Sequence, residues 1–453
     1  MKISLLISLF LVAFVLCENP GTRVHLTTNF LTNAKNWALP KFFPGNKIDF
    51  NVPDTSIMGV KCSSMNGKLE IPNNSISFSL TKGAFHLNAR NMHMSMGVKL
   101  NLRIAKAHIS PSAHFQFDSQ TSLGVNGSGQ LQVTSLKVQN FKIPDTQASM
   151  PGVFKKIVNH FIHMINDKVQ SKINSIMPEV QKKVNTILST QPTSVPFGNL
   201  PIMIDSTFSS AIAFENNQMI IPNNLFAWNK QKPKARPPFS NSIAFPNEPI
   251  TTDFTLYFSE YSLNSFSYAA FDAKLLIDQL DFNEIVKVAK KEVLTNIFKG
   301  LDELLKQNPQ VKITVSAQNY PQFNIANNLF TTLTDLAISV NLKIQDKEIN
   351  LLLLHIIPEF SVAAQIVNNK DLHITLAKAA LKKLEIKLST FKTIDNAGLT
   401  NLINQLLAYF LPKINAKFFN GSIPINGPNF VLEKAQISFV NHHIKIQATP
   451  KFV

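Results

Sequence analysis

Alternating apolar and polar positions dominate the first third of the chain and predict antiparallel strands. From Met92 to Ile104 nearly every second residue is apolar, and the residues between them are mostly polar. A period of two is typical of a strand with one buried face and one wet face. The segment is either one very long strand or a pair of strands that bend at Gly97. Shorter runs repeat the pattern at Ile76, Phe78 and Leu80, at Phe115 and Phe117, and at Leu131 and Val133.

Beyond Pro151 the apolar period becomes that of a helix. The apolar stripe predicts a helix over about 153–188, which Pro178 should kink. At about 1.5 Å per residue such a helix is about 50 Å long, so an elongated sheet is expected beneath it. The stripe comprises Phe154, Ile157, Val158, Phe161, Ile162, Ile165, Val169, Ile173, Ile176, Val180, Val184, Ile187 and Leu188.

The second half repeats this order of strands, helix and strands. Amphipathic helices are expected over 282–305 and over 398–411, where Pro412 should end the second. The run Leu351 to Ile357 is apolar on both faces of any strand, so a second apolar layer of protein or lipid is expected against it. Further strands are predicted at 254–258, 336–344, 372–376 and 384–388.

A basic, proline-rich stretch separates the two halves and predicts an extended linker over 229–250. The pattern therefore favours an α+β protein with an N-terminal domain over 18–228 and a C-terminal domain over 251–453.

The beginning of the chain has the pattern of a secretory signal peptide over 1–17, with Lys2 followed by an apolar run to Cys17. An acylated lipoprotein cysteine is disfavoured because Leu16 is not small. We therefore expect a secreted, extracellular protein. Its mature chain keeps one cysteine, Cys62, so no intramolecular disulfide is expected. Asn73, Asn126 and Asn420 begin Asn-x-Ser sequons, which mark candidate glycosylated surface turns.

The formal net charge is +16, and removal of Lys2 with the leader lowers it by one. A basic secreted protein favours anionic lipid or bacterial glycolipid, whereas nucleic acid is not an expected partner outside the cell. The alternative is that the charge only keeps the protein soluble. No stretch reaches the ~18 to 20 uninterrupted apolar residues of a membrane-spanning helix, so an integral membrane protein is not expected.

The sequence lacks a nucleophile elbow, a His-Glu-x-x-His site and a phosphate-binding glycine loop. The nearest candidate for a zinc site is His160, His163 and Asp167, on one side of the predicted long helix. A polar border beside the apolar stripe is the favoured interpretation of these residues. His442 and His443 are adjacent on a predicted strand and should point to opposite faces. No enzymatic activity, metal or cofactor is therefore expected.

Nearly the whole mature chain resembles the lipid-binding family of bactericidal/permeability-increasing protein, lipopolysaccharide-binding protein and the plasma lipid-transfer proteins. The resemblance rests on short motifs in the expected order: Asn19–Gly21, Pro237–Phe239, Tyr257–Tyr261, Leu411–Asn415, Gly421–Ile425 and Phe430–Leu432. It implies two pseudo-symmetric elongated antiparallel barrels with long helices, joined by a central sheet into a boomerang.

The resemblance also implies a monomer that holds the acyl chains of a phospholipid in an apolar pocket of each half. The first pocket would use Phe30, Leu31, Phe154, Ile157, Phe161 and Ile165, and the second Leu402, Ile403, Leu406 and Phe410. Lys99, Arg103 and Lys106 would meet anionic headgroups at the tip of the first barrel. The implied function is lipid binding or transfer at anionic membranes; the alternative is a lipopolysaccharide-binding antibacterial factor of innate defence.

The sequence departs from this family in two respects. The family's disulfide between a barrel strand and the long helix would fall near Thr134 and Gln181, and neither is a cysteine. The basic tip also carries fewer charges than in the strongly bactericidal members.

Overall fold

The structure of the chain is a computed structural model. It describes residues 22–453 apart from 43, 53, 58–59, 102–105, 110–111, 143–170, 172–174, 176, 240–243, 247, 308, 345–346, 370, 420–422 and 426–429. Several predictions fall outside these described residues: the signal peptide, most of the helix over 153–188, the side chains of Cys62 and Lys106, and Phe154, Ile157, Phe161, Ile165, His160, His163, Asp167, Arg103 and Asn420.

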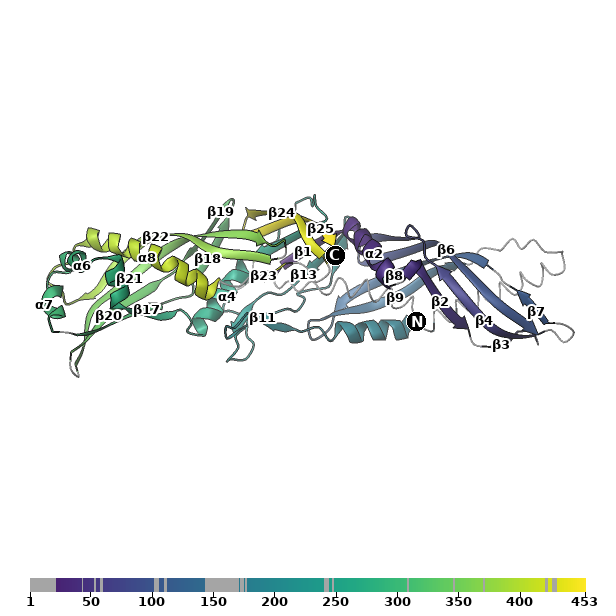
Figure 1. Ribbon diagram of the computed structural model, residues 1–453, viewed down its shortest axis with the longest axis horizontal. Coiled ribbons are helices and arrows are strands. Elements are labelled where there is room, and N and C mark those ends of the chain that lie inside the picture. Colours follow the sequence, from purple (N-terminus) through teal and green to yellow (C-terminus); the bar gives the residue numbers. More distant parts are fainter. Residues whose placement is uncertain are drawn as a thin grey trace.

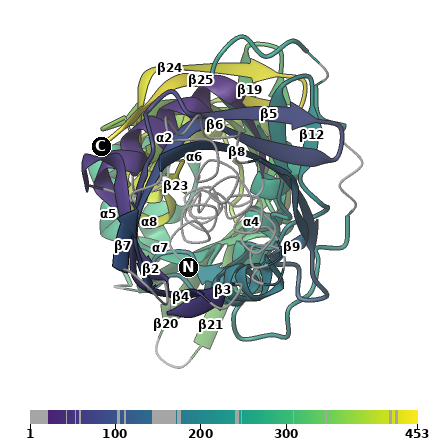
Figure 2. The ribbon, with the colours of Figure 1, turned by 90° about the vertical axis from the view of Figure 1, so that its right-hand side faces the viewer.

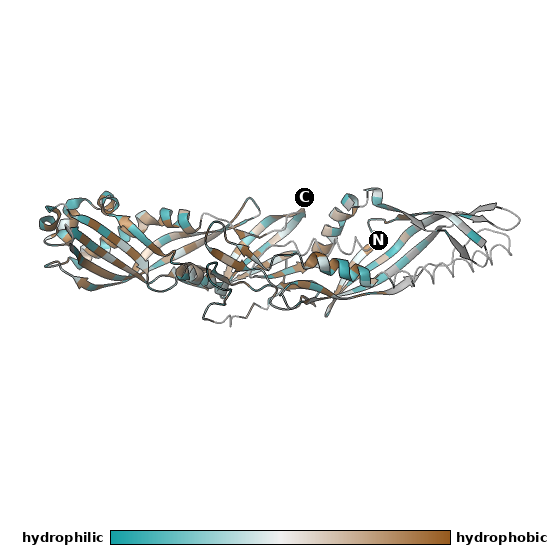
Figure 3. Cartoon of the chain, turned by 90° about the horizontal axis from the view of Figure 1, so that it is seen from below, coloured by the Kyte–Doolittle hydropathy of each residue, from teal (hydrophilic) through white to brown (hydrophobic). Residues whose placement is uncertain are grey.

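The molecule is elongated, with a large antiparallel sheet at each end and a six-stranded sheet between them (Figure 1). Seen along the long axis, strands of the N-terminal sheet curl around that axis (Figure 2). Apolar and polar residues alternate along many strands (Figure 3). This mixture of curled sheets and helices agrees with the α+β class that the pattern predicts.

The N-terminal sheet contains the described part of the long alternating segment, from Met92 to Asn101, in a single strand, β6, of 18 residues. A register shift lies between Ala89 and Met92, where Asn91 has a φ of 55°, and β4 carries another opposite Gly97. The first of the two alternatives, one very long strand, is therefore confirmed. The strands are β2 (Lys47–Val52), β3 (Thr55–Ile57), β4 (Val60–Glu70), β5 (Ile76–Thr81), β6 (Ala84–Asn101), β7 (Lys106–Ile109), β8 (Ser112–Val125) and β9 (Leu131–Lys142).

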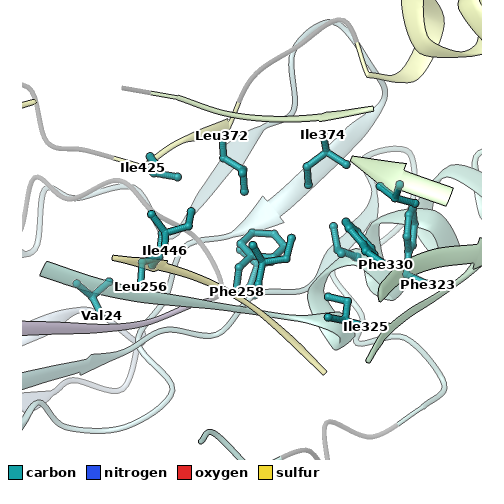
Figure 4. Packing of buried hydrophobic residues seen from close by; sticks show 14 of the residues in the cluster. Val24, Leu256, Phe258, Phe323, Ile325, Phe330, Leu372, Ile374, Ile425 and Ile446 are labelled. Carbon is teal, nitrogen blue, oxygen red and sulfur yellow. The ribbon is translucent and has the colours of Figure 1, made fainter. Parts of the chain in front are cut away.

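The central sheet joins strands from the beginning, middle and end of the chain. Strand β1 pairs with both β13 and β15, and all six residues of β15 are buried. The core of the central sheet continues into the C-terminal half, since Phe258 belongs to the same buried cluster as Phe330 and Ile374 (Figure 4). The strands are β1 (Thr22–Thr27), β12 (Ala213–Glu215), β13 (Gln218–Pro222), β15 (Phe254–Ser259), β24 (Phe430–Val440) and β25 (His443–Phe452).

Residues 230–239 of the basic linker form no helix or strand and are fastened to the protein surface. Lys232 forms an ion pair of 2.5 Å with Asp272, and Lys234 one of 3.1 Å with Asp205. The Arg236 guanidinium lies 5.8 Å from the centre of the Phe226 ring. These contacts hold the linker against α4 (Glu260–Asp272) and a small sheet of β10 (Ser194–Pro196), β11 (Ile202–Asp205) and β14 (Ala227–Asn229).

The C-terminal sheet is built on two very long strands, β21 and β22. The two strands predicted at 372–376 and 384–388 are one strand, whose pairing with β21 shifts register instead of ending. Leu352, Leu354 and Ile356 are buried, whereas Leu353 and Ile357 on the other face are partly exposed. The strands are β16 (Ile277–Asp281), β17 (Gln310–Ala317), β18 (Gln322–Ala326), β19 (Leu329–Leu333), β20 (Leu336–Ile344), β21 (Lys347–Val367), β22 (Asp371–Ser389) and β23 (Ile423–Pro424).

The single helix predicted over 282–305 is wrong. The segment forms three short helices, α5 (Phe282–Val288), α6 (Lys291–Ile297) and α7 (Leu301–Leu305). It breaks at Ala289, which is extended with a φ of −125°, and at Gly300, whose φ of 101° suits glycine. Val293 of α6, which would lie on the apolar side of a continuous helix with Ile285, Ala289 and Ile297, is 46% exposed.

Pro412 does not end the last helix, α8 (Asn396–Phe418), which continues beyond it. A proline inside a helix removes one backbone hydrogen bond. Contacts beyond Pro412 offset this loss, because Ile414 and Phe418 lie on the apolar side of the helix and Asn415 bonds to β22.

In both halves an asparagine side chain on a helix forms hydrogen bonds with both the N–H and the carbonyl of one residue on a bulged strand. We call this arrangement an asparagine clip. Asn185, in the helical segment 177–188, accepts from the Val133 N–H at 2.7 Å and donates to its carbonyl at 3.0 Å. Asn415 does the same with Leu376, at 2.9 Å for each bond. Each clipped residue precedes a one-residue bulge, at Thr134 and Ala377, where the strand's own pairing shifts.

The clip in the N-terminal half lies where the family's disulfide would be. Gln181 donates to the carbonyls of Val133 and Thr134 at 3.0 and 3.3 Å. The same helical segment buries Val180, Val184 and Leu188 as the stripe predicts, whereas Ile187 is 39% exposed, so its place in the predicted stripe is wrong.

We expect Asn415→Ala to destabilise the C-terminal half by about 1–3 kcal/mol, since it leaves the Leu376 N–H and carbonyl without partners. The midpoint of urea unfolding measures the effect. Asn401→Ala, at an exposed position on the same helix, is the matched control. Equal midpoints for the two variants would show that the clip contributes nothing.

Candidate functional site

A cavity of about 540 Å³ lies inside the C-terminal half, between the sheet and helices α5 to α8. This volume is within the range of about 300–1,000 Å³ that is typical of ligand pockets. Its apolar lining from the strands is Leu280, Val311, Ile313, Val315, Leu336, Ile338, Val340, Leu342, Leu351, Leu352, Leu354, Ile356 and Phe360.

The residues that line the cavity recur at the spacing of a strand or of a helix. Alternate residues of β20, from Leu336 to Leu342, face the cavity because side chains of a strand point to opposite faces in turn. Helix α8 presents one stripe, from Leu399 to Ile414, at spacings of three and four. Asp395 caps the start of this helix by accepting from the Ala397 N–H at 3.1 Å.

All four residues predicted for the second pocket line this cavity: Leu402, Ile403, Leu406 and Phe410. Leu402 and Ile403 are each only 4% exposed. The resemblance did not point to the strand residues or to the contributions of α5 to α7, such as Ile285, Leu294 and Leu301. The alternation of the strand residues and the helical spacing of the others were the only pattern in the sequence that indicated these buried faces.

The polar residues among the lining are gathered at one end. Asp278, Gln279, Asp281, Glu284 and Lys287 come from β16 and α5, and Lys413 and Lys417 come from the last turns of α8. Most of them are exposed. The cavity therefore opens between the end of α8 and the β16–α5 segment.

Two ion pairs cross this open end. Lys413 pairs with Glu284, and Lys417 lies 3.2 Å from Asp278. Hydrogen bonding to Glu284 raises the pKa of Lys413, which keeps its ammonium group charged. That ammonium also lies 5.1 Å from the ring centre of Phe410, so it adjoins the apolar lining.

Only two of the residues predicted for a first pocket, in the N-terminal half, are among the described residues. Phe30 and Leu31, on α2 (Thr28–Phe42), are 2% and 0% exposed. The Phe30 ring packs edge-on against Phe430 and Phe452 of the central sheet, at 5.5 and 5.2 Å between centres. Their role in a first pocket stays a prediction, because its other residues lie outside the described part.

Two of the three residues of the predicted basic tip lie on described strands at the end of the N-terminal sheet (Figure 1). Lys99 is exposed on β6, and Lys106 lies on the neighbouring strand β7, where its backbone pairs with Asn101. The two sequons that the structure describes, at Asn73 and Asn126, both lie in turns between strands, and Asn73 is exposed.

No group of three or more histidine, cysteine, aspartate or glutamate residues that could hold a metal occurs in the described part of the chain. His442 and His443 bind different partners: His442 lies 3.1 Å from Glu260, and His443 donates to the Asn441 carbonyl at 2.7 Å. Over the same described residues, none of the helices combines the length and the apolar character needed to cross a membrane.

No family model and no curated protein matches the sequence. Solved structures do match. The chain is similar to lipopolysaccharide-binding protein, with a TM-score of 0.49 and 13% sequence identity over 96% of this chain and 99% of that one. It is also similar to P47 of Clostridium botulinum E1, with a TM-score of 0.30 and 10% identity over 95% of this chain and 99% of that one.

Proposed function

We propose that this protein is a non-catalytic lipid-binding or lipid-transfer protein that holds acyl chains in its C-terminal cavity. The observation that carries this proposal is the separation of apolar and polar side chains along the cavity lining. Its interior consists of aliphatic and aromatic side chains, and its polar side chains stand at the open end. A ligand that matches both parts is an amphiphile with its hydrocarbon inside and its polar head at the opening.

The size of the cavity supports the same proposal. Without a ligand, the apolar lining of this cavity of about 540 Å³ stays in contact with water. Each Å² of apolar surface that a ligand removes from water contributes about 25 cal/mol. Hydrocarbon chains cover this lining without needing hydrogen-bond partners.

We extend the proposal to two pseudo-symmetric barrels in a boomerang, each with a phospholipid pocket. The matching clips of Asn185 on Val133 and Asn415 on Leu376 support a common plan for the two halves. The first pocket would then lie beneath the helix predicted over 153–188.

We propose that the protein is secreted and that it exchanges lipid while docked on an anionic membrane surface. The net charge of +16 and the exposed Lys99 at the end of the N-terminal sheet support electrostatic docking. The same charge suits lipopolysaccharide, and a role in antibacterial defence is the second candidate.

Extraction of the purified protein and mass spectrometry of the extract test the proposal. We expect phospholipid in a fixed ratio to protein, retained through gel filtration. Protein that carries no lipid, and that takes up none from vesicles of phosphatidylcholine and phosphatidylglycerol, would contradict it. Killing of Gram-negative cells by the intact protein would favour the second candidate.

A further inference from the structure

The open end of the C-terminal cavity carries a balanced set of charges. Its lining includes three basic side chains, Lys287, Lys413 and Lys417, and three acidic ones, Asp278, Asp281 and Glu284. Asp281 caps α5 by accepting from the Asn283 N–H at 3.0 Å. Lys413 and Lys417 lie one helical turn apart on α8, so both ammonium groups stand on the same side of the helix.

The carboxylates hold these two lysines weakly. Side-chain exposure is 52% for Lys413 and 27% for Glu284, and 44% for Lys417 and 62% for Asp278. Ion pairs this exposed contribute little stability, because water and salt compete with them. A phosphate group offers more acceptor oxygens than one carboxylate and can bridge two ammonium groups.

An acyl chain in the cavity would bring its headgroup to these lysines. Phe410, Ile414 and Phe418 line the cavity on the same turns of α8. A chain packed against them ends beside Lys413 and Lys417. The polar end of the ligand and the two ammonium groups therefore meet at the opening.

We propose that Lys413 and Lys417 form a binding subsite for the phosphate of the bound lipid, and that Glu284 and Asp278 occupy these lysines until the lipid enters. This inference rests on the proposed function, because it needs an acyl chain in the cavity. On binding, each lysine exchanges its carboxylate for a phosphate oxygen. A lipid without phosphate leaves the original ion pairs in place and gains nothing from the lysines.

If the lipid phosphate replaces the carboxylates as the partner of the lysines, substitutions of the lysines and of the carboxylates should change lipid affinity in opposite directions. Neutralising the lysines removes the phosphate contacts, so affinity for a phosphate-bearing lipid should fall. Neutralising the carboxylates removes the competitor, so that affinity should rise. A purely structural role of the ion pairs would make both changes weaken binding alike.

Titration with two fluorescent lipids of identical acyl chains, phosphatidic acid and diacylglycerol, tests the subsite. We expect the wild-type chain to bind phosphatidic acid about tenfold more tightly than diacylglycerol, the scale of two charge-assisted contacts at an exposed site. K413Q/K417Q should lose most of this preference, and D278N/E284Q should bind phosphatidic acid several-fold more tightly than wild type. Circular dichroism confirms that each variant is folded.

A matched control separates the subsite from net charge. K382Q/K387Q removes the same charge and two comparable ion pairs, Lys382 with Glu359 at 2.9 Å and Lys387 with Glu385 at 2.6 Å, on β22 outside the cavity lining. This variant should keep the wild-type preference. Inorganic phosphate at millimolar concentration should not displace phosphatidic acid, since it lacks the chain.

The outcomes distinguish the two proposals. If neither lipid binds the wild-type chain, the proposed function fails. If both lipids bind with equal affinity, or K413Q/K417Q behaves like K382Q/K387Q, the cavity holds acyl chains but the phosphate subsite is wrong. Competitive displacement by inorganic phosphate would also overturn it, because the lysines would then be a site for the free ion.

Discussion

Leu406→Trp is expected to fold normally and to purify with less lipid in the C-terminal cavity than wild type. Leu406 lines the cavity from α8 and is only partly buried, so a larger side chain can turn inward without displacing the sheet. The indole then covers lining that an acyl chain would otherwise cover. Because it fills space instead of creating it, we expect the melting temperature of the lipid-stripped variant to equal or exceed that of lipid-stripped wild type.

Mass spectrometry of extracted lipid and thermal melting measure the two parts of this prediction. Leu388→Trp is the control, because Leu388 is 44% exposed on β22 and does not line the cavity. A second variant, Leu406→Ala, enlarges the cavity and should keep its lipid. If Leu406→Trp retained lipid to the same ratio as Leu388→Trp, the cavity would not be the lipid site.

The lining of α8 could be predicted from the sequence because it depends on local spacing. Leu402, Ile403, Leu406 and Phe410 lie three or four positions apart, and a helix places such residues on one face whatever surrounds it. The family resemblance then assigned that face to a pocket. The strand residues of β20 were predicted as strand by the same local rule.

Helix ends were less predictable because tertiary contacts decide them. Pro412 is a strong signal for the end of a helix, yet the bonds of Asn415 to Leu376 and the apolar contacts of Ile414 hold the chain helical beyond it. Conversely, the apolar spacing over 282–305 predicts one continuous helix, but the chain breaks at Ala289 and Gly300.

The open end of the cavity could not be predicted from local pattern at all. Its two ion pairs join residues 129 and 139 positions apart, Glu284 with Lys413 and Asp278 with Lys417. No period in the sequence links such positions. The two asparagine clips are likewise visible only once the helix is seen against its strand.

Acid is expected to destabilise the central sheet through two buried histidines, His25 and His443. They are 6% and 0% exposed and flank Tyr257, with ring centres 5.7 and 6.3 Å from its ring. His25 Nδ1 donates to the Gln218 side chain at 3.0 Å, and His443 Nδ1 donates to the Asn441 carbonyl at 2.7 Å. Both Nε2 atoms are buried without a hydrogen-bond partner among the described residues.

Burial lowers the pKa of both histidines below the ordinary value of 6.5, because protonation would place a charged N–H without a partner in the core. Nearby charges act in both directions. Arg23 lowers the pKa of His25 further, and His442 lowers that of His443 while Glu260 raises it. Lys445 and Glu248, the other charged groups around Tyr257, form an ion pair of 2.9 Å with each other.

The lowered pKa values set the sign of the pH dependence. Below about pH 6.5 the unfolded chain binds protons that the folded chain does not, so the free energy of unfolding falls as the pH falls through this range. Above it both states carry neutral imidazoles and the contribution is constant. Urea midpoints at pH 8, 6.5 and 5 should therefore decrease mainly in the second step.

Replacing the histidines isolates their share of this acid sensitivity. His25→Gln/His443→Gln should lower stability at pH 8, where the packing against Tyr257 is lost, and should flatten the decrease between pH 6.5 and 5 relative to wild type. His114→Gln is the control, because His114 is exposed on β8 and should leave the slope unchanged. If the urea midpoint of the double variant decreased as much between pH 6.5 and 5 as that of His114→Gln, the acid sensitivity would come from groups other than His25 and His443.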